Sequence, residues 1–191
     1  MTTNASPTSV DRILTAATRI AQAHGYGGLN LRALADQVGI KAGSLYHHFP
    51  SKADLAAAVA RRYAEDSAVV LAALEAETGR PELALRRYPE TFRRSLENDN
   101  RMCLCSFMAA EYDDLPAAVQ HAIQAFADIN VAWLARMLQA AGLAGAKPAH
   151  LRASAIFAAV SGAQLMARGK ADIALFDALM DNYRAAGLFS A

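Results

Sequence analysis

The chain of 191 residues lacks any segment in which apolar and polar residues alternate strictly between turn residues, so its sequence predicts no β-sheet. It has only two cysteines, Cys103 and Cys105, which lie too close together to staple a fold; this predicts a reduced, cytoplasmic protein. No apolar run reaches the ~18 residues that a bilayer-spanning helix needs, and residues 1–7 do not resemble a signal peptide. These absences point away from β proteins, secreted disulfide scaffolds and membrane proteins.

The composition favours helices throughout. Hydrophobic residues make up 54% of the chain, enough for a packed core, and Ala, Leu, Arg and Glu are abundant. We therefore predict an all-α protein of about nine helices. Charge is uneven, because residues 1–63 carry a net +4 and the remainder −3. A basic end on an acidic body is typical of a nucleic-acid-binding segment, although chance asymmetry would give the same pattern.

The N-terminal quarter of the chain predicts three helices. Thr8 and Asp11 fit a capping box that opens the first. Asn30 is a good N-cap for a short second helix, and Gly39 is the glycine that commonly ends one. A third short helix is expected over 42–49. Two short helices joined by a glycine turn, after a longer first helix, outline a helix-turn-helix.

The third predicted helix offers small, hydroxylic, cationic and aromatic residues on its outward positions. Such a helix can enter a major groove about 12 Å wide, while Leu45 and Phe49 face inward. Lys41 and Lys52 flank the helix, where phosphates would lie. The candidate DNA-binding residues are Lys41, Ala42, Gly43, Ser44, Tyr46, His47 and Lys52.

The run from Gly39 to Lys52, GIKAGSLYHHFPSK, resembles the recognition-helix signature of TetR-family repressors, and residues 30–39 resemble their second helix. The resemblance covers residues 9–63. It implies that Tyr46 touches a phosphate and that Lys52 contacts the DNA backbone or caps the fourth helix. It also implies a helix-turn-helix domain over 1–52, with residues 1–7 disordered, and a ligand-binding and dimerisation domain over 53–191.

The same resemblance implies a cavity in the C-terminal domain that binds a small, mostly apolar effector. Apolar and aromatic residues are the candidates for its lining, and for each of them simple core packing is the alternative. These candidates are Tyr63, Tyr88, Phe92, Phe107, Met108, Trp133, Met137 and Met166.

The last two helices of the family pair with those of a second copy, which implies a homodimer here. Their apolar residues are the candidates for the interface: Ile156, Phe157, Val160, Phe176, Leu179, Met180 and Tyr183. A two-fold dimer would present two recognition helices to a palindromic double-stranded operator, with half-sites ~34–36 Å apart or a multiple of this.

The sequence shows no catalytic constellation, metal-ligand spacing or phosphate loop, so we predict no enzyme, cofactor or metal. Cys103 allows a second interpretation, in which its thiol senses oxidants, since Arg101 nearby would lower the pKa of that thiol. Simple packing of Cys103 in the core is the alternative. The resulting prediction is a transcriptional repressor released from its operator by a small hydrophobic effector. The alternatives are a helical partner-binding protein and a helical enzyme using Cys103 or His121.

Overall fold

A computed structural model describes residues 8–189, and the tail expected over 1–7 lies outside this range. The described residues form ten α-helices and one short 3-10 helix with no strand, which confirms the all-α prediction. None of these helices is long and apolar enough to cross a membrane. The α-helices are α1 Ser9–His24, α2 Leu31–Val38, α3 Ala42–His48, α4 Lys52–Thr78, α5 Pro81–Arg87, α6 Glu90–Glu97, α7 Leu104–Ala109, α8 Ala117–Ala140, α9 Ala146–Gly169 and α10 Ile173–Ala185; the 3-10 helix η1 is Tyr112–Asp114.

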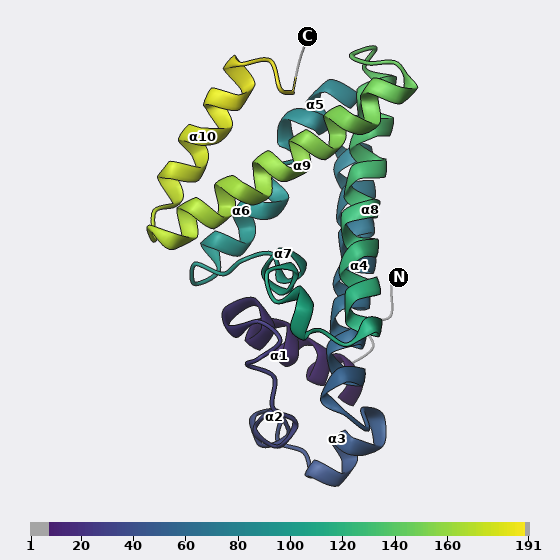
Figure 1. The fold of residues 1–191 in the computed structure, drawn as a ribbon, viewed down its shortest axis with the longest axis vertical. Helices are drawn as coiled ribbons and strands as arrows, with labels where there is room; N and C mark the ends of the chain where they lie inside the picture. The colour runs from purple at the N-terminus through teal and green to yellow at the C-terminus, as the bar shows by residue number, and fades with distance from the viewer. Residues whose placement is uncertain (1–7, 190–191) are drawn as a thin grey trace.

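The molecule is elongated, with α1, α2 and α3 gathered at one end (Figure 1). We call these three helices the head and α4–α10 the body. The long helix α4 leaves the head and packs along α8, and α8 in turn packs against α9. The last helix, α10, packs against α9 on the side away from α8 (Figure 1). The head therefore meets the body mainly through α4, with α7 as a second contact to α1.

Local signals set the limits of the head helices. The capping box is present, because the Thr8 hydroxyl accepts from the Asp11 N–H and the Asp11 carboxylate accepts from the Thr8 N–H. The Asn30 side chain accepts from the Ala33 N–H at 3.1 Å and starts α2. Ile13, Leu34 and Leu45, one from each helix, are fully buried and form the centre of the head.

Helix α4 is continuous over 27 residues and belongs structurally to both parts. Ser51 caps it by accepting from the Asp54 N–H at 3.1 Å. Small buried residues, among them Ala56 and Ala60, let the neighbouring helices approach closely. An ion pair of 3.0 Å joins Arg62 to Asp11 and ties α4 to the start of α1.

Two segments of the body have local features that bear on its helix count. The helix that begins at Pro81 is divided before Pro89, which has no N–H to continue it, so the described residues hold ten α-helices beside the predicted figure of about nine. Helix α7 begins only at Leu104, after Cys103, whose ψ of 124° is not helical and whose N–H donates to the Gln164 side chain at 3.0 Å.

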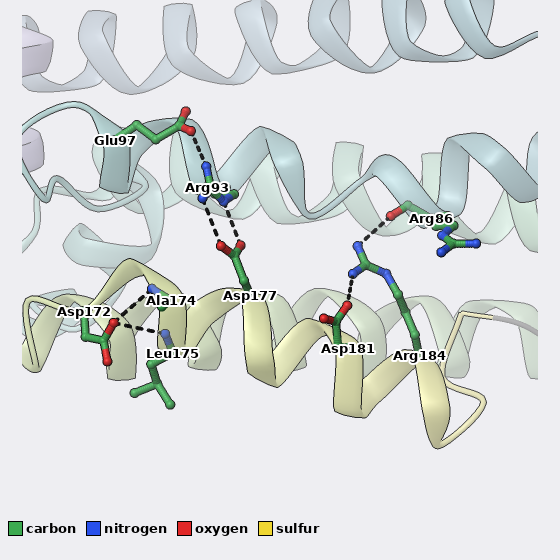
Figure 2. Close-up of polar contacts among 9 residues, drawn as sticks. All are labelled: Arg86, Arg93, Glu97, Asp172, Ala174, Leu175, Asp177, Asp181 and Arg184. Atoms are coloured by element: carbon green, nitrogen blue, oxygen red, sulfur yellow. Dashed lines mark hydrogen bonds and ion pairs between the residues drawn. The ribbon is translucent and has the colours of Figure 1, made fainter.

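Polar contacts fasten α10 to the layer formed by α5 and α6. Arg93 on α6 makes two hydrogen bonds to Asp177 on α10, of 2.7 and 2.9 Å, and also pairs with Glu97 (Figure 2). Arg184 donates to Asp181 and to the carbonyl of Arg86 (Figure 2). A bidentate guanidinium–carboxylate pair fixes orientation as well as distance, so these contacts set the angle of α10.

The burial of Leu45 gives a stability prediction. Leu45→Ala should lower the free energy of unfolding by about 3 kcal/mol, because it leaves a cavity at the centre of the head. Urea unfolding followed by circular dichroism at fixed protein concentration measures the loss. Val69→Ala, at a position 68% exposed, is the control and should change the stability by less than about 0.5 kcal/mol. Equal effects of the two substitutions would contradict this view of the head.

Candidate nucleic-acid interface and ligand cavity

The turn between α2 and α3 has the geometry of a helix-turn-helix. Gly39 ends α2 in the left-handed conformation, with φ 74° and ψ 39°, which glycine adopts without steric cost. The N–H of Ile40 donates to the carbonyl of Ala35 at 3.0 Å, so the chain leaves α2 with its carbonyls satisfied. Leu34 and Leu45 then pack α2 and α3 together in the head core.

The outward face of α3 is free of protein contacts that would block access to it. Gly43, Ser44 and His47 are exposed and Tyr46 is 43% exposed, while Leu45 is buried. A Cβ added at Gly43 would meet no atom within 4 Å, so this side of the helix offers open space. Lys41 just before the helix is exposed as well, and Ala42 is half-buried. Six candidate DNA-binding residues thus lie together along one short helix.

Lys52, the seventh candidate, is held by the protein itself. Its ammonium group donates to the carbonyl of Gly27 at 3.2 Å and lies 4.3 Å from the centre of the Tyr26 ring. The contact joins the start of α4 to the turn after α1. The sequence does not signal this, because the partners are 25 residues apart.

A cavity of about 240 Å³ opens in the body beside α4. Two of the predicted lining residues, Tyr63 and Phe92, are brought together there, and Phe126 lies with its ring centre 5.5 Å from that of Tyr63. The full lining is Thr18, Tyr63, Asp66, Ser67, Val70, Thr91, Phe92, Cys103, Phe126 and Asn130. We call this space the chamber; its wall is mainly apolar, with a few polar groups.

Asn130 is the most deeply buried polar group of the chamber wall. Its amide nitrogen donates to the carbonyl of Phe126 at 2.9 Å and to the hydroxyl of Ser67 at 3.3 Å, and its oxygen accepts from the Tyr88 hydroxyl at 2.9 Å. Burial raises the pKa of Tyr88 well above its ordinary value, so the phenol stays a donor. Our sequence prediction missed Asn130, although an asparagine within the apolar stripe of Phe126, Trp133 and Met137 was a usable signal.

The other predicted lining residues do not reach the chamber. Tyr88 and Trp133 stack with ring centres 5.7 Å apart in the core beside it, and Met108 and Met137 are buried in the same core. Phe107 packs against the guanidinium of Arg168. Met166 is 52% exposed, so its assignment to the cavity is corrected: it lies on a face of α9 that points away from the body core.

A second cavity of about 240 Å³ lies between α7, α8 and α9. Cys105, Ser106, Phe157 and Ser161 are among its lining residues, and Phe126 contributes to both cavities. The Phe126 ring is 6.1 Å from that of Phe157. A single aromatic side chain therefore belongs to the walls of both spaces.

The two cysteines differ from the thiols expected of an oxidant sensor. Both are buried, and burial raises the pKa of the Cys103 thiol and, more strongly, that of Cys105. Arg101 is not among the groups that shift either thiol, which corrects the expectation that it lowers the Cys103 pKa. His121 is exposed on α8, and no group of three potential ligands within residues 8–189 is placed to hold a metal.

The predicted dimer residues also need a correction. Ile156, Val160, Phe176 and Met180 are at most 2% exposed within one chain, so their side chains belong to its own core. Phe157, Leu179 and Tyr183 are half-buried. The outward face of α9 is instead a stripe of apolar and small residues, which we call the α9 stripe: Leu151, Ala155, Ala158, Gly162, Leu165 and Met166. Helical periodicity identifies apolar faces but does not say which of them a helix turns to its own chain.

Comparison with known proteins addresses both parts of the molecule. Residues 13–59 match the family model described as "Bacterial regulatory proteins, tetR family". The fold is similar to that of a TetR transcriptional regulator from Legionella pneumophila, with a TM-score of 0.88 and 25% identity over 96% of this chain and 98% of that one. No curated protein matches the chain by sequence.

Two further solved structures are similar over most of their length. A TetR-family transcriptional regulator from Agrobacterium tumefaciens has a TM-score of 0.83 and 29% identity, over 91% of this chain and 94% of that one. The transcriptional regulator FadR from Bacillus subtilis, in complex with stearoyl-CoA, has a TM-score of 0.66 and 17% identity, over 89% and 95%. The likeness to the last is one of fold alone.

The burial of the two cysteines can be tested by the reactivity of their thiols. At neutral pH both thiols should react with the disulfide reagent DTNB more slowly in the native protein than in denaturant, because burial shields them from the reagent and raises their pKa, which lowers the fraction present as thiolate. Raising the pH should accelerate the native reaction. The absorbance of the thiolate released from DTNB measures both rates. Equal rates in the native and the denatured protein would contradict the burial of the thiols.

Proposed function

We propose that the chain is a DNA-binding transcriptional regulator of the TetR family, since residues 13–59 match that family's model and the fold is similar to that of TetR-family regulators. In this proposal it is a repressor released from a palindromic operator by a small, mostly apolar effector. The observation that carries the proposal is the exposed α3, held by α2 through a glycine turn at the end of an elongated molecule. A body cavity beside the helix that enters the head supports the effector-responsive part.

In the proposed complex α3 lies in the major groove. Ser44 and His47 face the base edges, and Gly43 allows the DNA to come close to the helix backbone. Tyr46 and Lys41 contact phosphates, which fix the register of the helix without reading sequence. Lys52 acts at the same border, with its ammonium group already placed by Gly27 and Tyr26.

The effector is proposed to occupy the chamber. Tyr63, Phe92 and Phe126 provide apolar surface, while Asn130 and Ser67 provide polar groups that fix orientation. The solved B. subtilis FadR is in complex with stearoyl-CoA, so a body of this fold can hold a ligand with an apolar part. The chamber here, about 240 Å³, suits a much smaller compound.

Release follows if the effector prefers the conformation that does not fit DNA. Helix α4 carries chamber residues such as Tyr63 and Ser67 and begins beside the head, so a shift of α4 changes the spacing of the two recognition helices. If the effector binds the conformation that cannot bind DNA ~100-fold more tightly than the other, the coupling free energy between effector binding and DNA binding is about 2.7 kcal/mol.

The proposed dimer is formed through α9 and α10. The α9 stripe supports this, since Leu151 is 76% exposed and Leu165 57% exposed and small residues lie between them. Small residues let helices approach closely, and burial of the leucines contributes about 25 cal/mol per Å². The alternative of an enzyme using Cys103 or His121 gains no support, because the Cys103 thiol is buried with a raised pKa and His121 is exposed.

Binding to DNA tests the proposal directly. Fluorescence anisotropy with labelled duplexes from the regions flanking the gene should show salt-dependent binding. Lys41→Ala should weaken it and reduce the slope of log affinity against log salt by about 1, as expected for one lost phosphate contact. Lys147→Ala, at an exposed lysine of the body, is the matched control and should leave the slope unchanged. Absence of salt-dependent binding to every flanking duplex would refute the proposal.

Oligomeric state tests the interface separately. Leu165→Glu should shift the protein from dimer to monomer in analytical ultracentrifugation, because a charge buried in an apolar interface has no partner there. Val69→Glu places the same charge at an exposed apolar position of α4, outside the α9 stripe, and should leave the dimer intact. A Leu165→Glu protein that sediments as a dimer at micromolar concentration would remove α9 from the interface.

A further inference from the structure

Side chains from the body converge on the turn that joins α1 to α2. Glu111, which follows α7, and Arg168, in the last turn of α9, both bind backbone groups between residues 22 and 27. These contacts join parts of the chain that are 84 to 146 residues apart in sequence. They form a second attachment of the head to the body, independent of α4.

Glu111 holds the turn itself. One carboxylate oxygen accepts from the N–H of Tyr26 at 2.7 Å and the other from the N–H of Gly27 at 3.4 Å. Gly25 has a φ of +64°, and a Cβ there would lie 2.3 Å from a Glu111 oxygen and 2.6 Å from a ring carbon of Phe107. The backbone thus approaches the carboxylate as closely as a residue without a side chain permits.

Arg168 holds the end of α1. Its guanidinium donates to the carbonyl of Gln22 at 2.9 Å and to that of Ala23 at 3.1 Å. The last carbonyls of a helix have no partner within the helix, so a cationic donor at this point satisfies them and interacts favourably with the helix dipole. The guanidinium also lies 4.9 Å from the centre of the Phe107 ring, which keeps it next to Glu111's segment.

The elements that carry these two residues also touch the cavities. Cys103, immediately before α7, lines the chamber, and Ser106 on α7 lines the second cavity. On α9, Gln164 lies one turn before Arg168 and binds both the N–H of Cys103 and the carbonyl of Phe92. A movement of α7 or of the end of α9 therefore reaches the α1–α2 turn without passing through α4.

We propose that Glu111 and Arg168 are positioning residues for DNA binding: they hold the α1–α2 turn on the body and so fix the direction in which the helix-turn-helix projects. A ligand that moves α7 loosens this hold. The inference rests on the proposed function in so far as it assumes that the head binds DNA. Neither residue touches DNA in this scheme, since both face the body side of α1.

The test compares Glu111→Ala and Arg168→Ala with wild type by two readouts on the full-length protein. Hydrogen exchange of the backbone amides over residues 22–28 should accelerate in both variants. Glu111→Ala removes the acceptor of the Tyr26 and Gly27 amides, and Arg168→Ala removes the donor that holds the carbonyls of Gln22 and Ala23, so the segment opens more readily in each. Affinity for the bound duplex, measured by anisotropy without any effector, should fall about five- to tenfold, a typical size for coupling between sites. Glu111→Gln keeps one acceptor oxygen and should lie between Glu111→Ala and wild type in both measurements.

Arg136→Ala is the matched control. Arg136 pairs with Glu75 at 3.1 Å within the body, so its loss should change neither readout. Faster exchange with unchanged duplex affinity would overturn the positioning role, and unchanged exchange in both variants would show that the two residues do not hold the turn. Should Glu111→Ala fail to fold, Glu111→Gln decides by the same criteria. Failure of the wild type to bind any duplex counts against the proposed function, whereas the exchange readout needs no DNA.

Discussion

The packing of α4 against both α1 and α8 is the constraint on which the rest of the structure depends. A single helix from Lys52 to Thr78 passes from the head to the far end of the body without a break. Buried alanines and leucines of α4 contact the head at one end of the helix. Further along, Tyr63, Ser67 and Val70 of α4 line the chamber. A packed helix moves as a unit, so a displacement of α4 beside the chamber would also displace the end of α4 that contacts the head.

The head was predictable from the sequence because short-range chemistry determines it. Thr8, Asn30 and Ser51 cap helices with partners three residues away, and Gly39 supplies a left-handed residue at the turn. Such signals are readable without knowledge of the tertiary structure. The break before Pro89 has an equally local cause, since a proline has no N–H with which to continue the hydrogen bonds of a helix.

The body was predictable only as a set of helices. Periodicity gives each helix an apolar face, but Ile156 and Val160 face their own core while Leu151 and Leu165 face outward, and both pairs are equally apolar. The chamber depends on segments far apart in the chain, as in the contact of Asn130 with Ser67, so Tyr63 and Phe92 were found by residue type and Thr18 and Thr91 were missed. Lys52 shows the same limit, because its residue type suggests a phosphate contact and its bond to Gly27 follows only from the fold.

Two attachments of the head have different mechanical consequences. Helix α4 holds the head by its packing against α1, by the ion pair of Arg62 with Asp11 and by the bond of Lys52 to Gly27. Glu111 and Arg168 add a hold from α7 and α9 on the α1–α2 turn and on the end of α1. These contacts lie at or next to the turn, so the orientation of α3 depends on α4, α7 and the end of α9 keeping their relative positions. The chamber, lined by residues of α4 and by Cys103 before α7, lies where a ligand would change that position.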